Sequence, residues 1–268
     1  MVDSSSTTET NLEYKVRILV LRPFIKIAMS KIKIGMPHLS YNGLDPVWLL
    51  KELGGNHWAL LSEAVSFYNE TERLYASFFG IEIDFNKGQD HFKENDYLNL
   101  KSKIFKFNSQ IYRSIHTASV EDNSATVRLD SIFVKKDLVS GLLIRDEPNQ
   151  VHKNIDSVDR TFLEEHKQIK KKLKGIDQSE FNILPFSPEA YFNGVKILYC
   201  ANYLNLVLLS EYRTFNKIQR PIKKINLYFF KNISETDQVF GSTTENGNVY
   251  ETILLAKNKP IAFCRIER

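Results

Sequence analysis

The stretch that decides the fold is residues 44–65, which read LDPVWLLKELGGNHWALLSEAV. Asp45 suits the N-cap of a helix and Pro46 its first helical position, where the missing amide hydrogen has no partner to lose. The residues that follow are apolar on most faces, and Gly54-Gly55 can stop or bend the helix before a second apolar run continues it. So much apolar surface predicts a helix that is wrapped by a sheet.

Strand-like segments follow this helix. They are rich in β-branched and aromatic residues, and turn-forming residues separate some of them, as in the stretches NKG and EDN. One helix followed by several antiparallel strands predicts an α+β unit. The segments are 74–85, 97–108, 109–118 and 125–135.

The second half repeats this outline without any repeat of residues. Residues 145–180 are polar and charged, and they end in a helix-like EEHKQIKKKLKG with Gly175 as its C-cap. Beyond them an apolar helix, LNLVLLSEYRTF, precedes a second set of strands at 223–231, 248–257 and 260–267. One buried helix followed by strands therefore occurs twice.

The composition excludes several classes of protein. A 268-residue chain that is 43% hydrophobic and 25% charged can bury a core without disulfides. Its net charge of +4 is too weak to indicate nucleic-acid binding, but it suits an anionic ligand or an acidic carrier protein, or simply solubility. Residues 16–29 are apolar but interrupted by charges, so we expect neither a signal peptide nor a membrane anchor.

The two cysteines indicate a reducing compartment. Cys200 and Cys264 lie in apolar stretches without zinc-ligand spacing, which predicts buried free thiols and a reducing, cytoplasmic location. His116, His152 and His166 also lack ligand spacing with carboxylates or cysteines. We therefore expect no metal site.

Two sets of motifs resemble known families. GVKILYCANYLNL, residues 194–206, resembles the signature of acyl-CoA-type hot-dog thioesterases, in which this segment begins the central helix and grips the thioester carbonyl. GMPHL, GLDPVWLLKELGGNHWALL, RLYASFF and FKEND, in this order from residue 35 to 96, resemble a biosynthetic family of tandem hot-dog proteins. The best-known member of that family is the bifunctional acyltransferase/decarboxylase of the leinamycin polyketide pathway.

The resemblance implies an α+β fold of two tandem hot-dog domains that form a pseudo-dimer. Their sheets can join edge to edge, which removes an exposed strand edge, and the active cleft is expected between the halves. The predicted divisions are a disordered tail at 1–15, an N-terminal hot-dog at 16–144, a connecting segment at 145–180 and a C-terminal hot-dog at 181–268.

The resemblance also implies an enzyme. Its family takes an acyl group such as methylmalonyl from CoA and passes it, with decarboxylation to propionyl, to an acyl carrier protein. No cofactor is implied beyond the CoA or phosphopantetheine that carries the substrate, and the chain is expected to be a monomer or homodimer. Two alternatives stay open: a hot-dog thioesterase or dehydratase on carrier-bound chains, and a non-catalytic protein that binds an acyl carrier.

Two residues are candidates for catalysis. Tyr75, in YASF, matches the family's proposed catalytic tyrosine, either as a nucleophile or as a hydrogen-bond donor to a developing oxyanion. His57 is a candidate because the unperturbed pKa of a histidine lies near neutrality, where it can transfer protons. The alternative for both is a structural side chain in the core.

Other residues are candidates for substrate binding. Asn193, Gly194 and Asn202 surround the start of the second central helix, and Asn149 resembles a family asparagine. Small hot-dog thioesterases have an Asp before this helix, but here Glu189 is followed by Ala-Tyr-Phe-Asn, which puts hydrolysis by the second half in doubt. A cluster of lysines could contact CoA phosphates or a carrier, or form a solvated helix face; it comprises Lys170, Lys171, Lys172 and Lys174.

Overall fold

A computed structural model describes most of the chain. It covers residues 28–69, 72–137, 143–148, 155–157, 161–177, 179–194 and 196–268. The predicted tail and the predicted site residue Asn149 lie outside these described residues.

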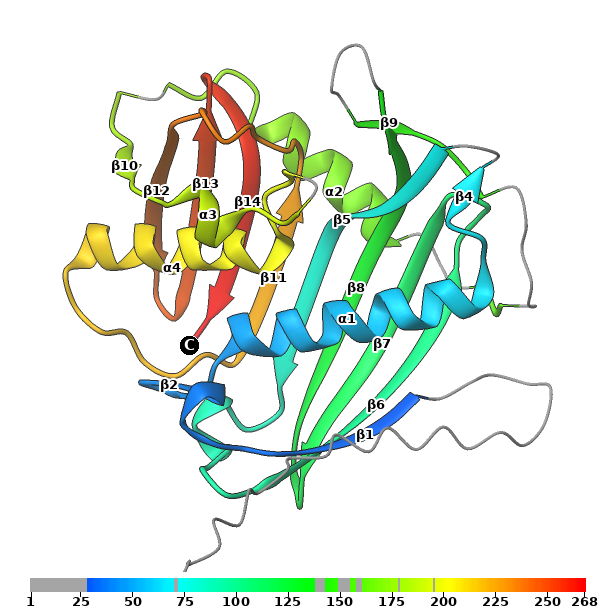
Figure 1. Ribbon diagram of the computed structural model, residues 1–268. Coiled ribbons are helices and arrows are strands. Elements are labelled where there is room, and N and C mark those ends of the chain that lie inside the picture. The colour runs from blue at the N-terminus through cyan, green and yellow to red at the C-terminus, as the bar shows by residue number, and fades with distance from the viewer. Residues whose placement is uncertain are drawn as a thin grey trace, which may run out of the picture.

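One antiparallel sheet of 12 strands dominates the described part of the chain. Along it the order is β1-β6-β7-β8-β5-β11-β14-β13-β12-β10, so that five strands of each half lie together (Figure 1). The first half supplies β1 (Ala28–Lys33), β5 (Glu72–Phe85), β6 (Tyr97–Lys106), β7 (Ile111–Val120) and β8 (Asn123–Lys136). The second half supplies β10 (Asn182–Leu184), β11 (Lys224–Phe229), β12 (Val239–Asn246), β13 (Val249–Ala256) and β14 (Lys259–Glu267).

Short elements complete the strands and turns. β4 (Tyr68–Asn69) pairs with β5, and β9 (Leu143–Arg145) pairs with β8. Before the first long helix, a 3-10 turn (Met36–His38) leads into a small hairpin of β2 (Leu39–Ser40) and β3 (Gly43–Leu44). A second 3-10 turn, Gln89–His91, follows β5, and a short helix α3 (Pro188–Tyr191) follows β10.

The two halves join edge to edge, as predicted. β5 and β11 pair antiparallel, with Ile81 opposite Leu227. The predicted strands are confirmed, but β12 was not predicted. Its buried positions are Val239, Gly241 and Thr243, which together carry too little apolar surface to give a strand signal.

Two long helices lie side by side against one face of this sheet (Figure 1). α1 (Pro46–Ala64) begins as predicted, with the Asp45 side chain accepting a hydrogen bond from the Val47 amide at 2.8 Å. The two glycines neither stop nor break it. α4 (Cys200–Phe215) is its counterpart in the second half. A helix wrapped by antiparallel sheet thus occurs twice, which confirms the tandem hot-dog fold.

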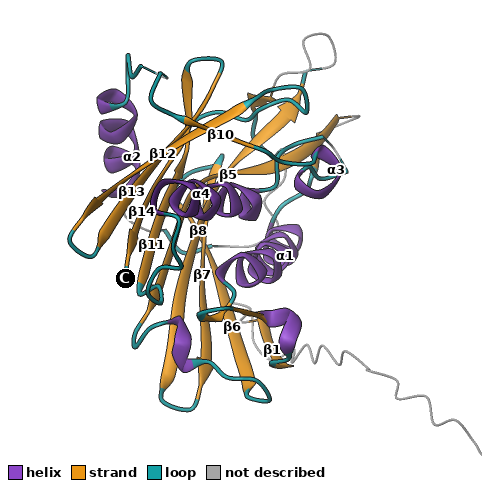
Figure 2. Ribbon diagram, turned by 90° about the vertical axis from the view of Figure 1, so that its left-hand side faces the viewer, coloured by secondary structure: helices purple, strands orange, loops and turns teal. Residues whose placement is uncertain are grey.

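A third helix, α2 (Thr161–Lys172), covers the opposite face of the sheet (Figure 2). Its Phe162 ring stacks on Tyr228 with the ring centroids 5.0 Å apart, and a side chain at Gly80 would overlap the same ring. The helix ends at Lys172, before the predicted C-cap Gly175, which lies at φ +77° in the turn that follows. The lysine cluster at its C-terminal end therefore lies across the sheet from α1 and α4.

The largest hydrophobic cluster spans both halves. Leu49 and Leu53 of α1, Leu204 of α4, and Ile81 and Leu227 of the joining strands all belong to it. The halves therefore share one core. Both cysteines are buried and unpaired, as predicted. Among the helices of the described residues, none combines the length and the apolar character that a membrane crossing requires.

Candidate functional site

His57 belongs to a buried chain of hydrogen-bonded side chains beneath α1. Its Nδ1 lies 2.6 Å from Ser114 Oγ and its Nε2 lies 2.8 Å from Ser131 Oγ. Ser114 Oγ also lies 2.6 Å from His116 Nε2, and His116 Nδ1 lies 2.7 Å from Ser102 Oγ. All five side chains are almost completely buried.

Both imidazoles in this chain are neutral. Burial lowers the pKa of His57 well below its ordinary value, and the nearby His116 lowers it further. Burial also lowers the pKa of His116 to about 3. A neutral imidazole has one donor and one acceptor nitrogen, so Ser114, which bridges the two rings, couples their tautomers. His57 therefore has all its hydrogen-bonding atoms occupied within the core.

Tyr75 lies on the other face of its strand. Its neighbours Leu74 and Ala76 pack against Leu61 at the end of α1, and side chains alternate between the faces of a strand. Tyr75 is half-buried, with the Arg73 guanidinium 5.5 Å from the centre of its ring. The structure does not bring it together with His57, and its catalytic role stays a prediction.

The predicted binding residues of the second half hold the start of α4 in place. The Asn202 side-chain amide donates to the Tyr191 carbonyl at 2.8 Å. Asn193 Oδ1 accepts a hydrogen bond from the Ile197 amide at 3.0 Å, and Gly194 is exposed beside it. These contacts fasten the preceding loop to the start of α4.

The N-terminus of α4 meets the middle of α1, and a protein side chain fills the space between the two helices. Tyr199 crosses from one helix to the other, and its hydroxyl lies 3.5 Å from the Lys51 carbonyl. A Cβ at Gly54 would lie 2.5 Å from this hydroxyl, so glycine makes room for it. Burial raises the pKa of the Cys200 thiol to about 12. A thiol with so high a pKa does not act as a nucleophile near neutral pH.

A cavity of about 150 Å³ lies at the other end, where the N-terminus of α1 meets α4. Both halves build it, and we call it the seam cavity. Neither His57, Tyr75 nor Asn202 lines it. Its lining residues are Ser40, Tyr41, Asn42, Asp45, Pro46 and Gln89 from the first half and Leu208, Ile222 and Arg268 from the second.

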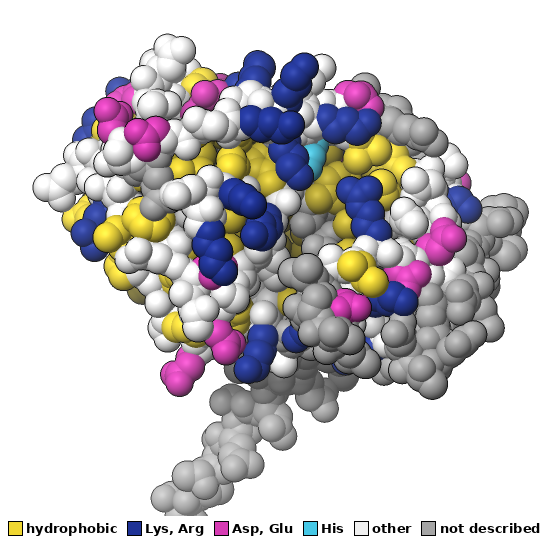
Figure 3. Space-filling view, turned by 90° about the horizontal axis from the view of Figure 1, so that it is seen from above, with side chains coloured by type: hydrophobic (Ala, Val, Ile, Leu, Met, Phe, Trp, Pro, Cys, Tyr) yellow, Lys and Arg dark blue, Asp and Glu magenta, His cyan; other side chains and the backbone are white. Residues whose placement is uncertain are grey.

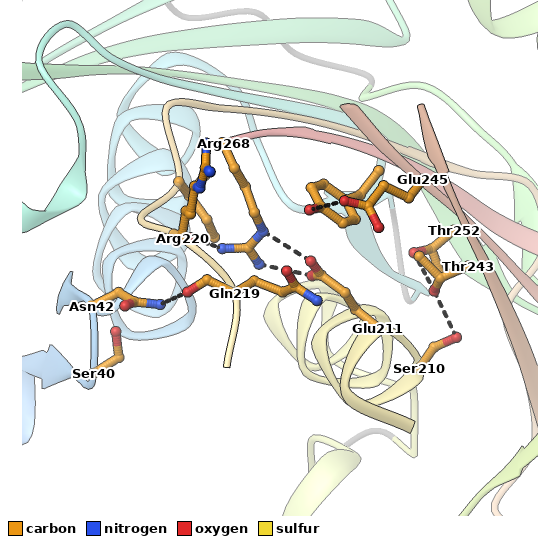
Figure 4. A network of polar contacts seen from close by, with 12 residues as sticks. Ser40, Asn42, Ser210, Glu211, Gln219, Arg220, Thr243, Glu245, Thr252 and Arg268 are labelled. Atoms are coloured by element: carbon orange, nitrogen blue, oxygen red, sulfur yellow. Dashed lines mark hydrogen bonds and ion pairs between the residues drawn. The ribbon is translucent and has the colours of Figure 1, made fainter. Parts of the chain in front are cut away.

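Hydrogen bonds between the halves fix the walls of the seam cavity. Buried Gln89 accepts from the Ile222 amide at 3.2 Å through Oε1 and donates to Ser40 Oγ at 3.3 Å through Nε2. The Asn42 side chain donates to the Gln219 carbonyl at 3.1 Å (Figure 4). These bonds keep the first-half loop against the segment that precedes β11.

The seam cavity has a carboxylate on one wall and a guanidinium on the other. Asp45 is the one acidic residue among its lining residues, and its bond to the Val47 amide uses only Oδ1. Arg268 is buried and paired with buried Glu211 of α4, with Nε–Oε1 and Nη2–Oε2 distances of 2.8 and 2.7 Å (Figure 4). Arg268 also donates to the Arg220 carbonyl.

These contacts leave both groups with hydrogen-bonding capacity. A guanidinium has five N–H donors, and the bonds from Arg268 to Glu211 and Arg220 use three of them. The positive end of the α1 dipole lies beside Asp45 and favours negative charge there. Asp45 and Arg268 thus both line the seam cavity, and each has hydrogen-bonding atoms that these contacts do not use.

From the sequence, Asp45 was predicted only to cap a helix. The sequence has an aspartate, Asp45, directly before the central helix of the first half, but none in residues 188–199 before that of the second half. Gln89 and Arg268 carry no local signal, because their partners are 133 and 57 residues away.

A second cavity, of about 240 Å³, lies on the sheet face that α2 covers. Both of its cations are already paired: Arg128 lies 2.6 Å and Lys224 lies 2.8 Å from the Glu82 carboxylate. A ligand there would have to displace these ion pairs, so the seam cavity is the better candidate site. The lining residues are Glu82, Arg128, Phe162, Glu165, Lys224 and Asn226.

Comparison with known proteins bears on the fold. No family model matches this sequence, and neither does any curated protein. The resemblance to the leinamycin-pathway family therefore stays a prediction.

Solved structures match nearly the whole chain. The 12:0-ACP thioesterase of Umbellularia californica matches 90% of this chain and 96% of its own, with a TM-score of 0.65 and 9% identity. An acyl-ACP thioesterase of Bacteroides thetaiotaomicron matches 90% of this chain and 97% of its own, with a TM-score of 0.59 and 9% identity. HtdX of Mycobacterium tuberculosis matches 90% of this chain and 99% of its own, with a TM-score of 0.57 and 9% identity. At such low identity the likeness shows the fold, which these proteins share from end to end.

Proposed function

We propose that the protein processes an acyl thioester in the seam cavity, and that hydrolysis is the reaction its residues support best. The observation that carries this proposal is a carboxylate, Asp45, at the start of a central hot-dog helix and in a cavity built by both halves. The end-to-end likeness to two thioesterases supports it.

The proposed step uses water as the nucleophile. Asp45 accepts a proton from a water at its free oxygen, and the water oxygen bonds to the thioester carbon. The negative charge that develops on the carbonyl oxygen is stabilised by the free N–H groups of Arg268. The carbon–sulfur bond then breaks, the thiolate takes the proton from Asp45, and a carboxylic acid and a thiol leave.

Acyl transfer from CoA to a carrier protein, with or without decarboxylation, has weaker support. It depends on Tyr75, which lies on the far face of β5 from α1. Dehydration of a carrier-bound chain requires a histidine with a carboxylate partner, but the ring nitrogens of His57 are bonded to two serines. Hydrolysis requires neither group.

The decisive variant is Asp45→Asn. Asparagine caps a helix about as well as aspartate, so the fold should persist while the general base is lost. We expect kcat for thioester hydrolysis to fall by about 10²-fold or more, with an unchanged melting temperature. Tyr75→Phe is the matched variant and should retain activity. Loss of activity in Tyr75→Phe with retention in Asp45→Asn would refute the proposal.

Product analysis separates the three functions. The wild-type protein is incubated with acyl-CoAs, including methylmalonyl-CoA, and an acyl carrier protein, and both free thiol and the mass of the carrier are measured. Free thiol without a loaded carrier supports hydrolysis. A carrier that gains an acyl group supports transfer, and binding of the carrier without either product supports the non-catalytic alternative.

A further inference from the structure

A basic segment borders the seam cavity. Residues 212–223 run from the last turn of α4 to β11 and contain four cations but no Asp or Glu. All four cations are exposed, and none of them takes part in an ion pair between described residues. They are Arg213, Lys217, Arg220 and Lys223.

Large apolar side chains are exposed around the same cavity. Tyr212 and Ile218 are 51% and 58% exposed, and Tyr41, which lines the cavity, is 83% exposed. The bond from Asn42 to the Gln219 carbonyl holds the Tyr41 loop against the basic segment. Cations and apolar anchors therefore share one surface, which we call the basic rim: residues 212–223 together with Tyr41.

The basic rim differs from the other basic features of the chain. Lys224, the next residue, is neutralised at 2.8 Å by Glu82. In α2, Lys167 is paired with Glu164 at 3.0 Å, and the helix lies on the opposite face of the sheet (Figure 2). Lys and Arg side chains also flank an apolar strip on the top face (Figure 3), at the end away from the C-terminus and the seam cavity. Of these surfaces, only the basic rim adjoins Asp45.

We propose that the basic rim docks an acidic carrier protein that delivers the acyl thioester to the seam cavity; this inference rests on the proposed function. Unpaired cations attract an acidic partner, and exposed Tyr and Arg side chains are the residue types that anchor protein interfaces. Because Tyr41 belongs both to the rim and to the cavity lining, a tethered acyl group reaches Asp45 without crossing the molecule.

A charge reversal with a matched control tests the docking surface. The rim variant is Arg213→Glu/Lys217→Glu/Lys223→Glu, and the control is Lys170→Glu/Lys171→Glu/Lys174→Glu on α2, with the same change in charge. Binding to a labelled type II acyl carrier protein is measured by fluorescence anisotropy at low and high salt, and melting temperatures verify folding. We expect the rim variant to bind about 10-fold or more weakly and the control to change by less than about 2-fold.

Two results would overturn the docking surface. One is unchanged carrier binding in the rim variant, whatever the result for the α2 control. The other would show that the rim is a site for phosphate groups. In that case the rim variant loses affinity for CoA and for the carrier equally, and CoA fully displaces the carrier from the wild-type protein. A second variant, Tyr41→Ala/Ile218→Ala, keeps every charge and should weaken carrier binding without changing its salt dependence.

Hydrolysis of a small acyl-N-acetylcysteamine thioester separates this inference from the proposed function. If the wild-type protein cleaves it but does not bind the carrier, only the docking inference fails. If the protein binds the carrier through the rim but cleaves no thioester, only the proposed function fails.

Discussion

The two halves bury polar groups between helix and sheet in different ways. In the first half the chain beneath α1 includes the imidazoles of His57 and His116. In the second half Ser210 of α4 lies 3.0 Å from Thr243, and Thr243 lies 2.9 Å from Thr252, so the corresponding chain contains hydroxyl groups alone (Figure 4).

A second difference lies one residue further along α4. There the second half buries a full ion pair, Glu211 with Arg268. The chain beneath α1 is therefore stable only while its imidazoles are neutral, and the pair beside α4 only while it is complete. The first half also buries an ion pair, Arg113 with Asp130 at 2.6 Å, but that pair lies between the strands β7 and β8. The same fold accommodates the neutral histidine chain and the charged pair, because the side chains of both have hydrogen-bonding partners.

The largest effect on stability should come from breaking the pair in the second half. Glu211→Gln leaves the Arg268 charge buried without its counter-ion, so we expect the free energy of unfolding to fall by about 3–5 kcal/mol. Urea denaturation measures it. Glu251→Gln is the control, since Glu251 and Arg265 form an exposed pair at 2.6 Å, and its loss should cost less than about 1 kcal/mol. Equal losses in the two variants would contradict the comparison.

Acid should act on the first half. Because the folded-state pKa of each buried histidine lies below the unfolded value near 6.5, the unfolded state binds more protons, and stability falls as the pH falls below about 6.5. Between pH 7 and pH 5 we expect a loss of about 2 kcal/mol for each imidazole. Urea denaturation at both pH values measures the loss.

His116→Gln isolates this contribution. Glutamine keeps a donor and an acceptor for Ser102 and Ser114 but does not titrate. The variant should lose about 2 kcal/mol less than the wild-type protein between the two pH values. Ser210→Ala in the second half should leave the pH dependence as it was. A wild-type pH dependence in His116→Gln would show that the imidazole is not responsible.

The smallest effect tests how the halves meet at the start of α4. Gly55 has open space around its Cα, so Gly55→Ala should stabilise α1 by about 1 kcal/mol through helix propensity alone. At Gly54 the same change meets the Tyr199 hydroxyl, and the gain should be absent or reversed. In a Tyr199→Phe background, which lacks this hydroxyl, Gly54→Ala should recover part of the gain in stability. Thermal denaturation of the variants measures the coupling.

The fold was predictable to the extent that its signals are local. Asp45 and Pro46 mark the start of α1, and apolar runs between turn residues mark most of the strands. β12 was missed because two of its three buried positions, Gly241 and Thr243, are small or polar. The start of α4 had no local signal because Tyr199 gives its first turn no side-chain cap. The edge-to-edge joining of the two sheets was expected because it removes an exposed edge, but only the structure shows that β5 and β11 form the joint.

The candidate site was predictable only in part. Of the residues lining the seam cavity, only Asp45 and Pro46 had a predicted role, and both roles were structural. The two predicted catalytic residues, Tyr75 and His57, lie on opposite sides of the sheet. Side chains alternate between the faces of a strand, so a shift of one position in the register decides which face a residue such as Tyr75 occupies. Asn202 was placed correctly near a helix start, but its amide holds the preceding loop.

The sequence by itself determined the elements: which segments are helices and strands, that the pattern occurs twice, and that the interior is apolar enough to join the halves. Those properties depend on residues a few positions apart. Only the tertiary structure decided that Asp45 and Arg268 line one cavity and that Ser114 links His57 and His116 in one chain of hydrogen bonds. A hydrogen bond acts over about 3 Å, whereas Asn42 and Gln219 are 177 residues apart in the chain, so only the packing of the two halves brings such groups within reach.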